Sequence, residues 1–530
     1  MKRSSCFTVV GLAVSVAPSG AFVRQELRHF DRHDDHTRIR PSRNRSLLSK
    51  IRKERNDNLS CLLRWIRPMG LQSKSDENDS SSPFLNLFQF ELVSSISDIS
   101  EEDWDRCLCP QSSPFMEHSW LRCLEEGGCA TVEKGWMPSH VRIIMGDRIC
   151  GFVPLYVKSH SMGEFIFDSK WADAAHANDI RYYPKLLVGV PFTPVTGTRI
   201  LIDQTFREES TPSQLRAIRK LVSSFLEKLA LDNNMSSVHI NFATEEEVSD
   251  IAGPMLNLQR RNGKNNAGDV RTNNSRFLRR TSIQYHWRNA NPRRSNREYQ
   301  SFNEYLSCFR SKRRISVKRE RLKVREEEGI KIDAIVGREI LQHEGLIDRI
   351  YEIYVATVDK WHWGRQYLTL DFFRLLAKSS FVDNLCFMCA RRRSASSNQE
   401  FRANDVVAGT FNCIKNGVFY GRYWGCLEEV KNLHFETCYW SAIEYCIENG
   451  LVRMEPGAGG GDYKWSRGFD PVLIHSAHFI RHPGLRHAIR QFISYETSAN
   501  LELRDFLREN SVIHNDENTP NKQEESSVCK

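Results

Sequence analysis

The sequence predicts an α+β fold made of two globular domains. The chain has 530 residues, and at roughly 150 residues per domain this length is too great for a single small domain. Hydrophobic residues make up 40% of the chain and charged residues 27%, a composition that supports buried cores and excludes wholesale disorder or a fibrous repeat. Segments with the apolar spacing of helices alternate with segments typical of strands, as in a layered α+β domain.

Residues 1–83 are expected to be a presequence and a disordered linker. Lys2 and Arg3 precede the apolar run 7–16, and small residues follow at 19–21, which is the order of a signal peptide and its cleavage site. The apolar run is too short to span a bilayer, and no other run in the sequence reaches that length. We therefore expect targeting, and no membrane span.

The excess of positive over negative charge is confined to this leader. Residues 1–70 hold fifteen Lys and Arg against six Asp and Glu, so the net charge of +9 arises there and points to targeting rather than to nucleic acid. Phe22 follows the expected cleavage site, and an Arg- and Ser-bearing stretch continues to Arg67. This arrangement resembles the bipartite plastid presequences of algae with complex plastids. The resemblance implies a plastid (chloroplast) protein with a transit peptide; the alternative is a secreted protein with a basic linker.

The first domain is predicted to span residues 84–300. The dipeptide Gly146-Asp147 is typical of the turn of a β-hairpin, and one segment has apolar residues at the spacing of a helix. Two Asn- and Arg-rich stretches that contain glycine suggest loop insertions. The expected strands are 84–93, 141–156, 238–242 and 277–287, the expected helix is 214–229, and the insertions are 259–274 and 289–297.

The second domain is predicted to span residues 301–500 and to be followed by a polar tail, 501–530. Three meandering strands, then a helix, then a further strand indicate one layered α+β domain. The expected strands are 330–336, 384–391, 406–414, 418–424 and 452–455, and the expected helices are 341–360, 370–378 and 433–448.

The fifteen cysteines do not predict a disulfide framework or a metal site. Their number is odd and they are scattered through apparent helices and strands. Cys386 and Cys389 form a CxxC pair, but a strand would point the two side chains to opposite faces. We expect reduced core thiols and no metal.

The order of the second domain resembles the acyl-CoA N-acyltransferase (GNAT) fold, and several sequence blocks resemble the FemAB-like proteins of peptidoglycan biosynthesis or recognition. This resemblance implies two GNAT-like domains in tandem, joined by a basic helical connector. In one place the chain departs from the family pattern: relatives usually have Gln-Gly-Glu-His-Lys where this chain has Gly-Gly-Gly-Asp-Tyr-Lys at 459–464. The similar blocks are 160–168, 181–187, 191–197, 285–287, 311–324, 360–369, 420–425, 434–436, 463–464 and 467–469.

Chemistry of the GNAT type needs an unprotonated amine, donors for an oxyanion, and a place for phosphates. We expect Glu436 and His434 to serve as base and orienting partner, and Tyr423 and Arg422 to supply an acid and an anion contact. The alternatives are a first-turn carboxylate favoured by the helix dipole, a capping histidine, and strand packing for Tyr423.

Two further groups are candidates for substrate binding. Lys464 and Arg467 follow the Gly-rich turn 457–461 and could clamp a phosphate or a carboxylate; the alternative is two solvated cations on a surface loop. In the first domain Glu164, Asp168 and Trp171 could bind an amine, and a turn with hydrogen-bonding caps is the alternative.

A basic helix is expected at 310–325, where nine Lys and Arg accompany one Glu. The cations surround the helix, so we favour a solvated helix or one that bridges the two domains and meets acidic surface there. Contact with RNA phosphates is the alternative, which a transferase that uses aminoacyl-tRNA would need.

The resemblance implies a transferase that moves an acyl or aminoacyl group to an amine. The donor would be acyl-CoA or aminoacyl-tRNA, with no tightly bound cofactor, and the acceptor a small-molecule or peptidyl amine, with tRNA a possible partner. The loop 426–430 lacks the closely spaced Gly and Arg residues of a CoA cradle. A non-catalytic module that binds glycan, peptide or RNA is therefore the alternative.

The leader predicts a two-step import route. A fusion of residues 1–80 to a fluorescent reporter should reach the plastid, and Phe22→Ala should stall the reporter outside it. Fluorescence microscopy in an alga with a complex plastid makes the measurement, and secretion of the unaltered fusion would overturn the assignment.

Overall fold

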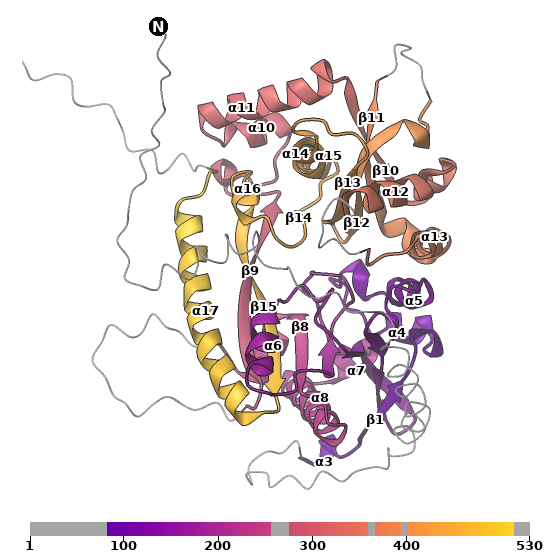
Figure 1. Ribbon diagram of the computed structural model, residues 1–530, viewed down its shortest axis with the longest axis vertical. Helices are drawn as coiled ribbons and strands as arrows, with labels where there is room; N and C mark the ends of the chain where they lie inside the picture. The colour runs from indigo at the N-terminus through magenta and orange to yellow at the C-terminus, as the bar shows by residue number, and fades with distance from the viewer. Residues whose placement is uncertain (1–81, 256–274, 359–365, 394–399, 514–530) are drawn as a thin grey trace, which may run out of the picture. The chain divides into compact units, whose positions relative to one another are not determined.

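The computed structural model describes residues 82–255, 275–358, 366–393 and 400–513. All of them belong to one compact unit, which spans Pro68–Lys530. Almost all of the expected presequence, the insertion 259–274 and most of the tail 501–530 lie outside the described residues. The fold is α+β, as expected (Figure 1).

A small sheet opens the first half of the chain. Its strand order is β1-β3-β4-β7, and all of its neighbours are antiparallel. The hairpin between β3 and β4 turns at Gly146, whose φ of 61° suits glycine, as the sequence predicted. The strands are β1 (Phe88–Val93), β3 (His140–Met145), β4 (Arg148–Val153) and β7 (Leu201–Ile202).

A larger sheet of eleven strands runs through both halves. Its order is β10-β11-β12-β13-β14-β9-β15-β8-β6-β5-β2. Only two neighbouring pairs are parallel, β6 with β8 in the first half and β13 with β14 in the second. The strands are β2 (Trp136–Pro138), β5 (Leu155–Lys158), β6 (Lys185–Val188), β8 (Ser237–Ala243), β9 (Leu278–Arg288), β10 (Ile330–Val336), β11 (Leu385–Arg392), β12 (Val406–Lys415), β13 (Val418–Cys426), β14 (Arg453–Glu455) and β15 (Asp470–Ile480).

Helices pack against these sheets, and their sequences explain where they begin. The predicted helix 214–229 is confirmed as α8, which starts at a capping box made by Thr211 and Gln214 and buries its apolar stripe. The helices are α3 (Ser82–Leu85), α4 (Glu101–Asp105), α5 (His118–Glu126), α6 (Ser169–His176), α7 (Gln204–Glu209), α8 (Pro212–Asp232), α9 (Glu245–Ala252), α10 (Phe302–Ser307), α11 (Ser311–Leu322), α12 (Leu346–Val358), α13 (Leu370–Lys378), α14 (Leu433–Phe435), α15 (Ser441–Glu448), α16 (Gly461–Trp465) and α17 (Pro483–Glu509), with π-helical turns at Lys323–Glu327 and Glu436–Trp440.

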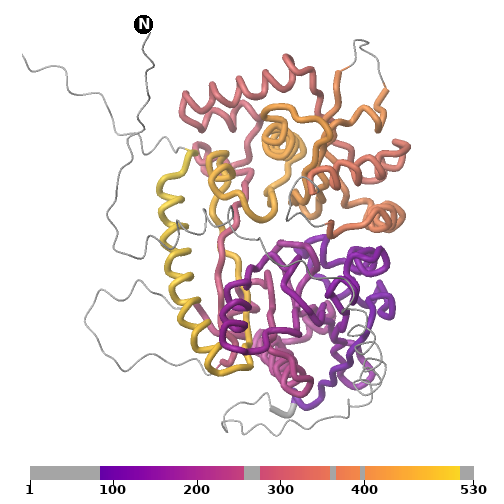
Figure 2. The backbone as a smooth tube through the Cα atoms, in the orientation of Figure 1, coloured from indigo at the N-terminus to yellow at the C-terminus, as the bar shows by residue number. Residues whose placement is uncertain are grey.

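The end of the chain returns to the first half. Strand β15 pairs with β8 and β9, and the long helix α17 lies along β9 and β15 (Figures 1 and 2). Strand β9 in turn pairs with β14. Strand pairing therefore crosses the predicted boundary at residue 300, and the division into 84–300 and 301–500 stays a prediction.

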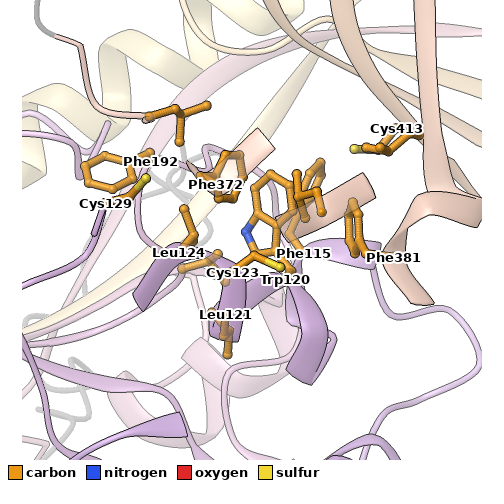
Figure 3. Close-up of a cluster of buried hydrophobic side chains, with 14 of the residues drawn as sticks. Phe115, Trp120, Leu121, Cys123, Leu124, Cys129, Phe192, Phe372, Phe381 and Cys413 are labelled. Atoms are coloured by element: carbon orange, nitrogen blue, oxygen red, sulfur yellow. The ribbon is translucent and has the colours of Figure 1, made fainter. Parts of the chain in front are cut away.

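The two halves share a hydrophobic core. Phe115 and Trp120 of the first half pack against aromatic rings of the second, with Trp120 4.9 Å from Phe381 and Phe115 5.4 Å from Tyr420 between ring centroids (Figure 3). Trp120 is 1% exposed. Such aromatic contacts combine a large buried area with a defined geometry. In the described part of the chain no helix is both long enough and apolar enough to cross a membrane.

The shared core predicts one cooperative unfolding transition. Trp120→Ala should lower the free energy of unfolding by about 3–5 kcal/mol, because it leaves a large cavity between the halves. Circular dichroism in urea should show a single shifted transition. Phe167→Ala, at a ring that is 73% exposed, is the control and should change stability by less than about 0.5 kcal/mol. Two separate transitions in the Trp120 variant would contradict a common core.

Candidate active site

The parallel strands β13 and β14 separate soon after they meet. They pair only at Val418–Arg453, Phe419–Met454 and Tyr420–Glu455, and β13 then continues to Cys426 while β14 ends. Beyond Tyr420, the edge of β13 that faced β14 has no strand beside it in the described part of the chain. An edge of this kind presents backbone N–H and C=O groups that a ligand can pair.

A β-bulge lies on β13 where the strands separate. Phe411 of β12 faces Tyr423 and Asn412 faces Gly421, so Arg422 is the extra residue. The Arg422 guanidinium donates from Nη2 to the carbonyl of Phe192, and its Nε is buried without a hydrogen-bond partner. The bulge thus turns a cation toward the first half of the chain. Burial lowers the pKa of Arg422 and raises the pKa of Tyr423 to about 12.

The loop 191–197 of the first half meets these strands. Phe192 has a φ of 57°, a strained value for a bulky side chain, and its carbonyl also accepts from the Tyr423 hydroxyl at 3.5 Å. Pro194 accepts from Gln284 Nε2 at 3.0 Å. The buried Arg199 holds the loop from behind by donating to Val195 at 2.6 Å. One loop of the first half therefore offers its carbonyl oxygens to β13 of the second half and to β9 of its own half.

Glu455 ends β14 at the point of separation and is 5% exposed. One carboxylate oxygen, Oε1, pairs with Arg453 at 2.9 Å, whereas Oε2 is buried without a hydrogen bond and lies 3.9 Å from His286 Nε2. Burial raises the pKa of Glu455 to about 7. Burial and the cations Arg453 and Lys464 lower the pKa of His286 to about 3, so His286 is neutral at physiological pH.

We call Arg422, Tyr423, Glu455, His286 and Gln284 the fork site.

The predicted cations Lys464 and Arg467 are buried, not solvated, at 2% and 4% exposure. Lys464 Nζ donates to the carbonyls of Gly457 at 2.6 Å and Ala458 at 3.4 Å, so it holds the Gly-rich turn that follows β14. Burial lowers the pKa of Lys464 to about 7. The Arg467 guanidinium lies 3.7 Å from the Phe435 ring centroid. Helix α16, which carries Lys464, packs on β9 of the fork site.

His434 and Glu436 do not form the predicted pair. The His434 ring lies among aromatic rings, 5.4 Å from Trp424 and 5.7 Å from Tyr439, and burial together with Arg467 and Lys464 lowers its pKa to about 4. No hydrogen bond joins it to Glu436 within the described residues. The reason is rotational: residues two apart on a helix point to different sides.

Glu436 is instead the acceptor for two arginines of the basic segment. Its Oε1 accepts from Arg325 Nε at 2.9 Å, Arg321 Nε at 3.2 Å and Ser441 Oγ at 2.9 Å, and the residue is 1% exposed. Glu444 pairs with the same two arginines. The acidic surface that the basic helix meets therefore lies on its own half of the chain, not across a boundary. A catalytic role for Glu436 stays a prediction.

The predicted carboxylates of the first half, Glu164 and Asp168, bind the side-chain ammonium group of Lys185. Lys185 Nζ donates to Glu164 at 2.9 Å and to Asp168 at 2.5 Å, and all three residues are buried. Burial raises the pKa of Glu164 to about 7; burial also raises the pKa of Asp168, but Lys185, His239 and Ser161 together lower it by more, so it falls overall. Trp171 lies beside this cluster, with its ring 5.0 Å from His478. Binding of a substrate amine there stays a prediction.

The structure thus brings Arg422 and Tyr423 together at the fork, and groups His434, Lys464 and Arg467 beside it. Glu455, His286 and Gln284 were not anticipated as site residues. Two of them could have been suspected, because His286 lies in the family-like block 285–287 and Glu455 stands two residues before the Gly-rich turn. In the described ranges, no group of three or more His, Cys, Asp or Glu side chains could hold a metal ion.

Comparisons with known proteins identify a family. Residues 95–514 match the model of the FemAB-like family, which is described as peptidoglycan biosynthesis/recognition. No curated protein matches the sequence. Three solved structures are similar to the chain: FemX (11% identity, 74% of this chain and 98% of that chain, TM-score 0.40), L-PGS from Bacillus licheniformis (10%, 70% and 95%, 0.36) and a tandem GNAT protein from the clavulanic acid biosynthesis pathway (9%, 75% and 99%, 0.33). Because these TM-scores lie below 0.5, the assignment rests on the family match.

The environment of Glu436 predicts a structural effect on substitution. Glu436→Gln should lower the free energy of unfolding by about 2–3 kcal/mol, because Arg321 and Arg325 lose a buried charged acceptor while Glu444 continues to pair with both. Glu326→Gln removes a carboxylate from an exposed ion pair with Arg393 and is the matched control; thermal unfolding should barely change. Equal stability of the Glu436 variant and the parent would contradict this arrangement.

Proposed function

Because the chain belongs to the FemAB-like family, we propose that it transfers an acyl or aminoacyl group to an amine at the fork site. Membership of the family supports aminoacyltransferase-type function in general and implies two GNAT-like domains in tandem. The observation that carries the finer proposal is a buried carboxylate with a spare oxygen, Glu455, at the point where β13 and β14 separate.

Glu455 has the properties of the general base. The reaction joins the amine nitrogen to the acyl carbon, breaks the C–O bond of an ester or the C–S bond of a thioester, and releases one proton from the amine. Glu455 Oε2 has no hydrogen-bond partner to give up, and a pKa of about 7 matches a base that works near neutral pH. Arg453 orients the carboxylate through Oε1.

The other groups of the fork site supply the remaining needs of the reaction. Arg422 Nε is a buried donor without an acceptor, and with the open edge of β13 it can stabilise negative charge on the acyl oxygen. The Tyr423 hydroxyl stays protonated at neutral pH because its pKa is about 12, so it can donate a proton to the leaving oxygen or sulfur. Lys464 keeps the turn after β14 in place.

We assign the base to Glu455 in preference to Glu436. Glu436 Oε1 already accepts from two guanidinium groups and from the Ser441 hydroxyl, so this carboxylate holds the basic segment in place, while its Oε2 is buried without a hydrogen-bond partner. Glu455 pairs with a single arginine, and it lies at the point where β13 and β14 separate.

The donor belongs to one of two chemical classes, acyl-CoA or aminoacyl-tRNA, and the acceptor is a small-molecule or peptidyl amine. A thermal-shift titration of the full chain distinguishes the donors, using acetyl-CoA in one series and an aminoacylated analogue of the tRNA 3′ end in another. A donor at about 100 times its Kd should stabilise the folded chain by about 2.7 kcal/mol. Arg422→Gln should weaken that shift.

A binding module is the second candidate. It is favoured by the substituted segment at 459–463 and by the carboxylates in the loop 426–430, where Glu428 pairs with Arg392. If neither donor shifts the melting temperature while a peptidoglycan fragment does, the transferase proposal fails and recognition replaces it.

The proposed base predicts the pH dependence of turnover. Glu455 is protonated below its pKa and cannot accept a proton, so kcat/KM should rise as the pH increases through about 7. Glu455→Gln should lower kcat/KM by about 10²- to 10⁴-fold and abolish this rise. Glu227→Gln is the control, because burial also raises the pKa of Glu227 on α8, away from the fork. An unchanged pH profile in the Glu455 variant would exclude Glu455 as the base.

A further inference from the structure

Helix α11 exposes two of its three aliphatic side chains and buries one of its charged side chains. Ile315 and Leu322 are 57% and 56% exposed, whereas Arg321 is 9% exposed. The buried Arg321 packs 4.1 Å from the centroid of the Phe302 ring and pairs with Glu436 and Glu444. A surface helix normally turns its apolar stripe toward the core. Val317 faces the core, whereas Ile315 and Leu322 are presented outward.

The exposed face of α11 has an ordered layout. At 3.6 residues per turn, Ile315 and Leu322 lie along the middle of the exposed stripe, with Lys318 on one side and Lys312 and Arg319 on the other. The ion pairs of the helix use Arg313 and Arg321. Lys312, Lys318 and Arg319 make no salt bridge in the described part of the chain. Figure 1 shows α11 at the periphery of the described fold, beside α10.

An aliphatic ridge flanked by cations matches the chemistry of an anionic lipid surface. A helix that lies in the membrane–water interface inserts its apolar side chains at the acyl boundary, while long basic side chains reach the headgroup phosphates. RNA-binding surfaces rely on cations with aromatic rings or base contacts, and the exposed face of α11 carries no aromatic residue. RNA would not require an exposed aliphatic ridge, so the ridge favours an anionic lipid surface over RNA as the partner of this face.

We propose that the outer face of α11 docks the protein on a membrane that contains anionic lipids. The ion pairs of Arg321 and Arg325 with Glu436 and Glu444 fix the orientation of the helix, so the face is presented without a change of fold. One short helix face gives weak, reversible attachment rather than permanent anchoring.

Co-sedimentation of the full chain with vesicles tests the proposal. Vesicles of phosphatidylcholine mixed with phosphatidylglycerol should bind the protein, vesicles of phosphatidylcholine alone should not, and added salt should weaken binding. The double variant Ile315→Gln, Leu322→Gln should reduce vesicle affinity by about tenfold or more. The triple variant Lys312→Gln, Lys318→Gln, Arg319→Gln should reduce it by about tenfold or more and remove most of the salt dependence.

Controls separate this face from other sources of binding. Leu503→Gln changes an exposed leucine of α17 and should leave vesicle affinity unchanged. All variants keep the basic segment 1–70, so binding that survives both α11 variants would come from elsewhere and would overturn the proposal. So would a lack of binding to either vesicle at low salt. Binding of poly(U) RNA that is lost in the triple variant, with vesicle affinity unaffected by the double variant, would assign the face to RNA.

Discussion

A guanidinium taken out of water must find acceptors, and Arg422 finds one in the other half of the chain. The bulge on β13 directs it to the Phe192 carbonyl, and the loop that carries Phe192 adopts a strained backbone to offer that oxygen. The same loop accepts from Gln284 on β9. These polar contacts and the aromatic core around Trp120 hold the separated strands β13 and β14 in a fixed relation to the first half.

The buried charged groups are of two kinds: some have hydrogen-bond partners for their charged atoms, and others keep a polar atom without a partner. Lys185 has two carboxylates and a hydroxyl around one ammonium, and Arg321 lies between two glutamates and a ring. Such groups stabilise the native arrangement of their neighbours. Glu455 Oε2 and Arg422 Nε are equally buried but have spare capacity. Unused capacity is costly in a folded protein, and Glu455 Oε2 and Arg422 Nε are two of several such buried atoms in the described part of the chain.

Local patterns allowed much of the fold to be predicted. The apolar period in α8, the glycine turn between β3 and β4, and the meander of β11, β12 and β13 depend on neighbouring residues, so they could be recognised in the sequence. The candidate site was harder. Arg422 and Tyr423 could be named from a motif, but Glu455 and His286 become neighbours only through pairing of β14 with β9. Likewise, Glu164 and Asp168 could be paired from sequence, whereas Lys185 filling the space between them is a tertiary contact.

The return of β15 to the first half has a consequence for biosynthesis. A ribosome releases the chain from its N-terminus, so β8 and β9 emerge long before the strand that lies between them. Until β15 arrives, both have an unpaired edge, which is a template for association with other chains. Completion of the first half thus waits for the last part of translation, and these strand edges stay open during that interval.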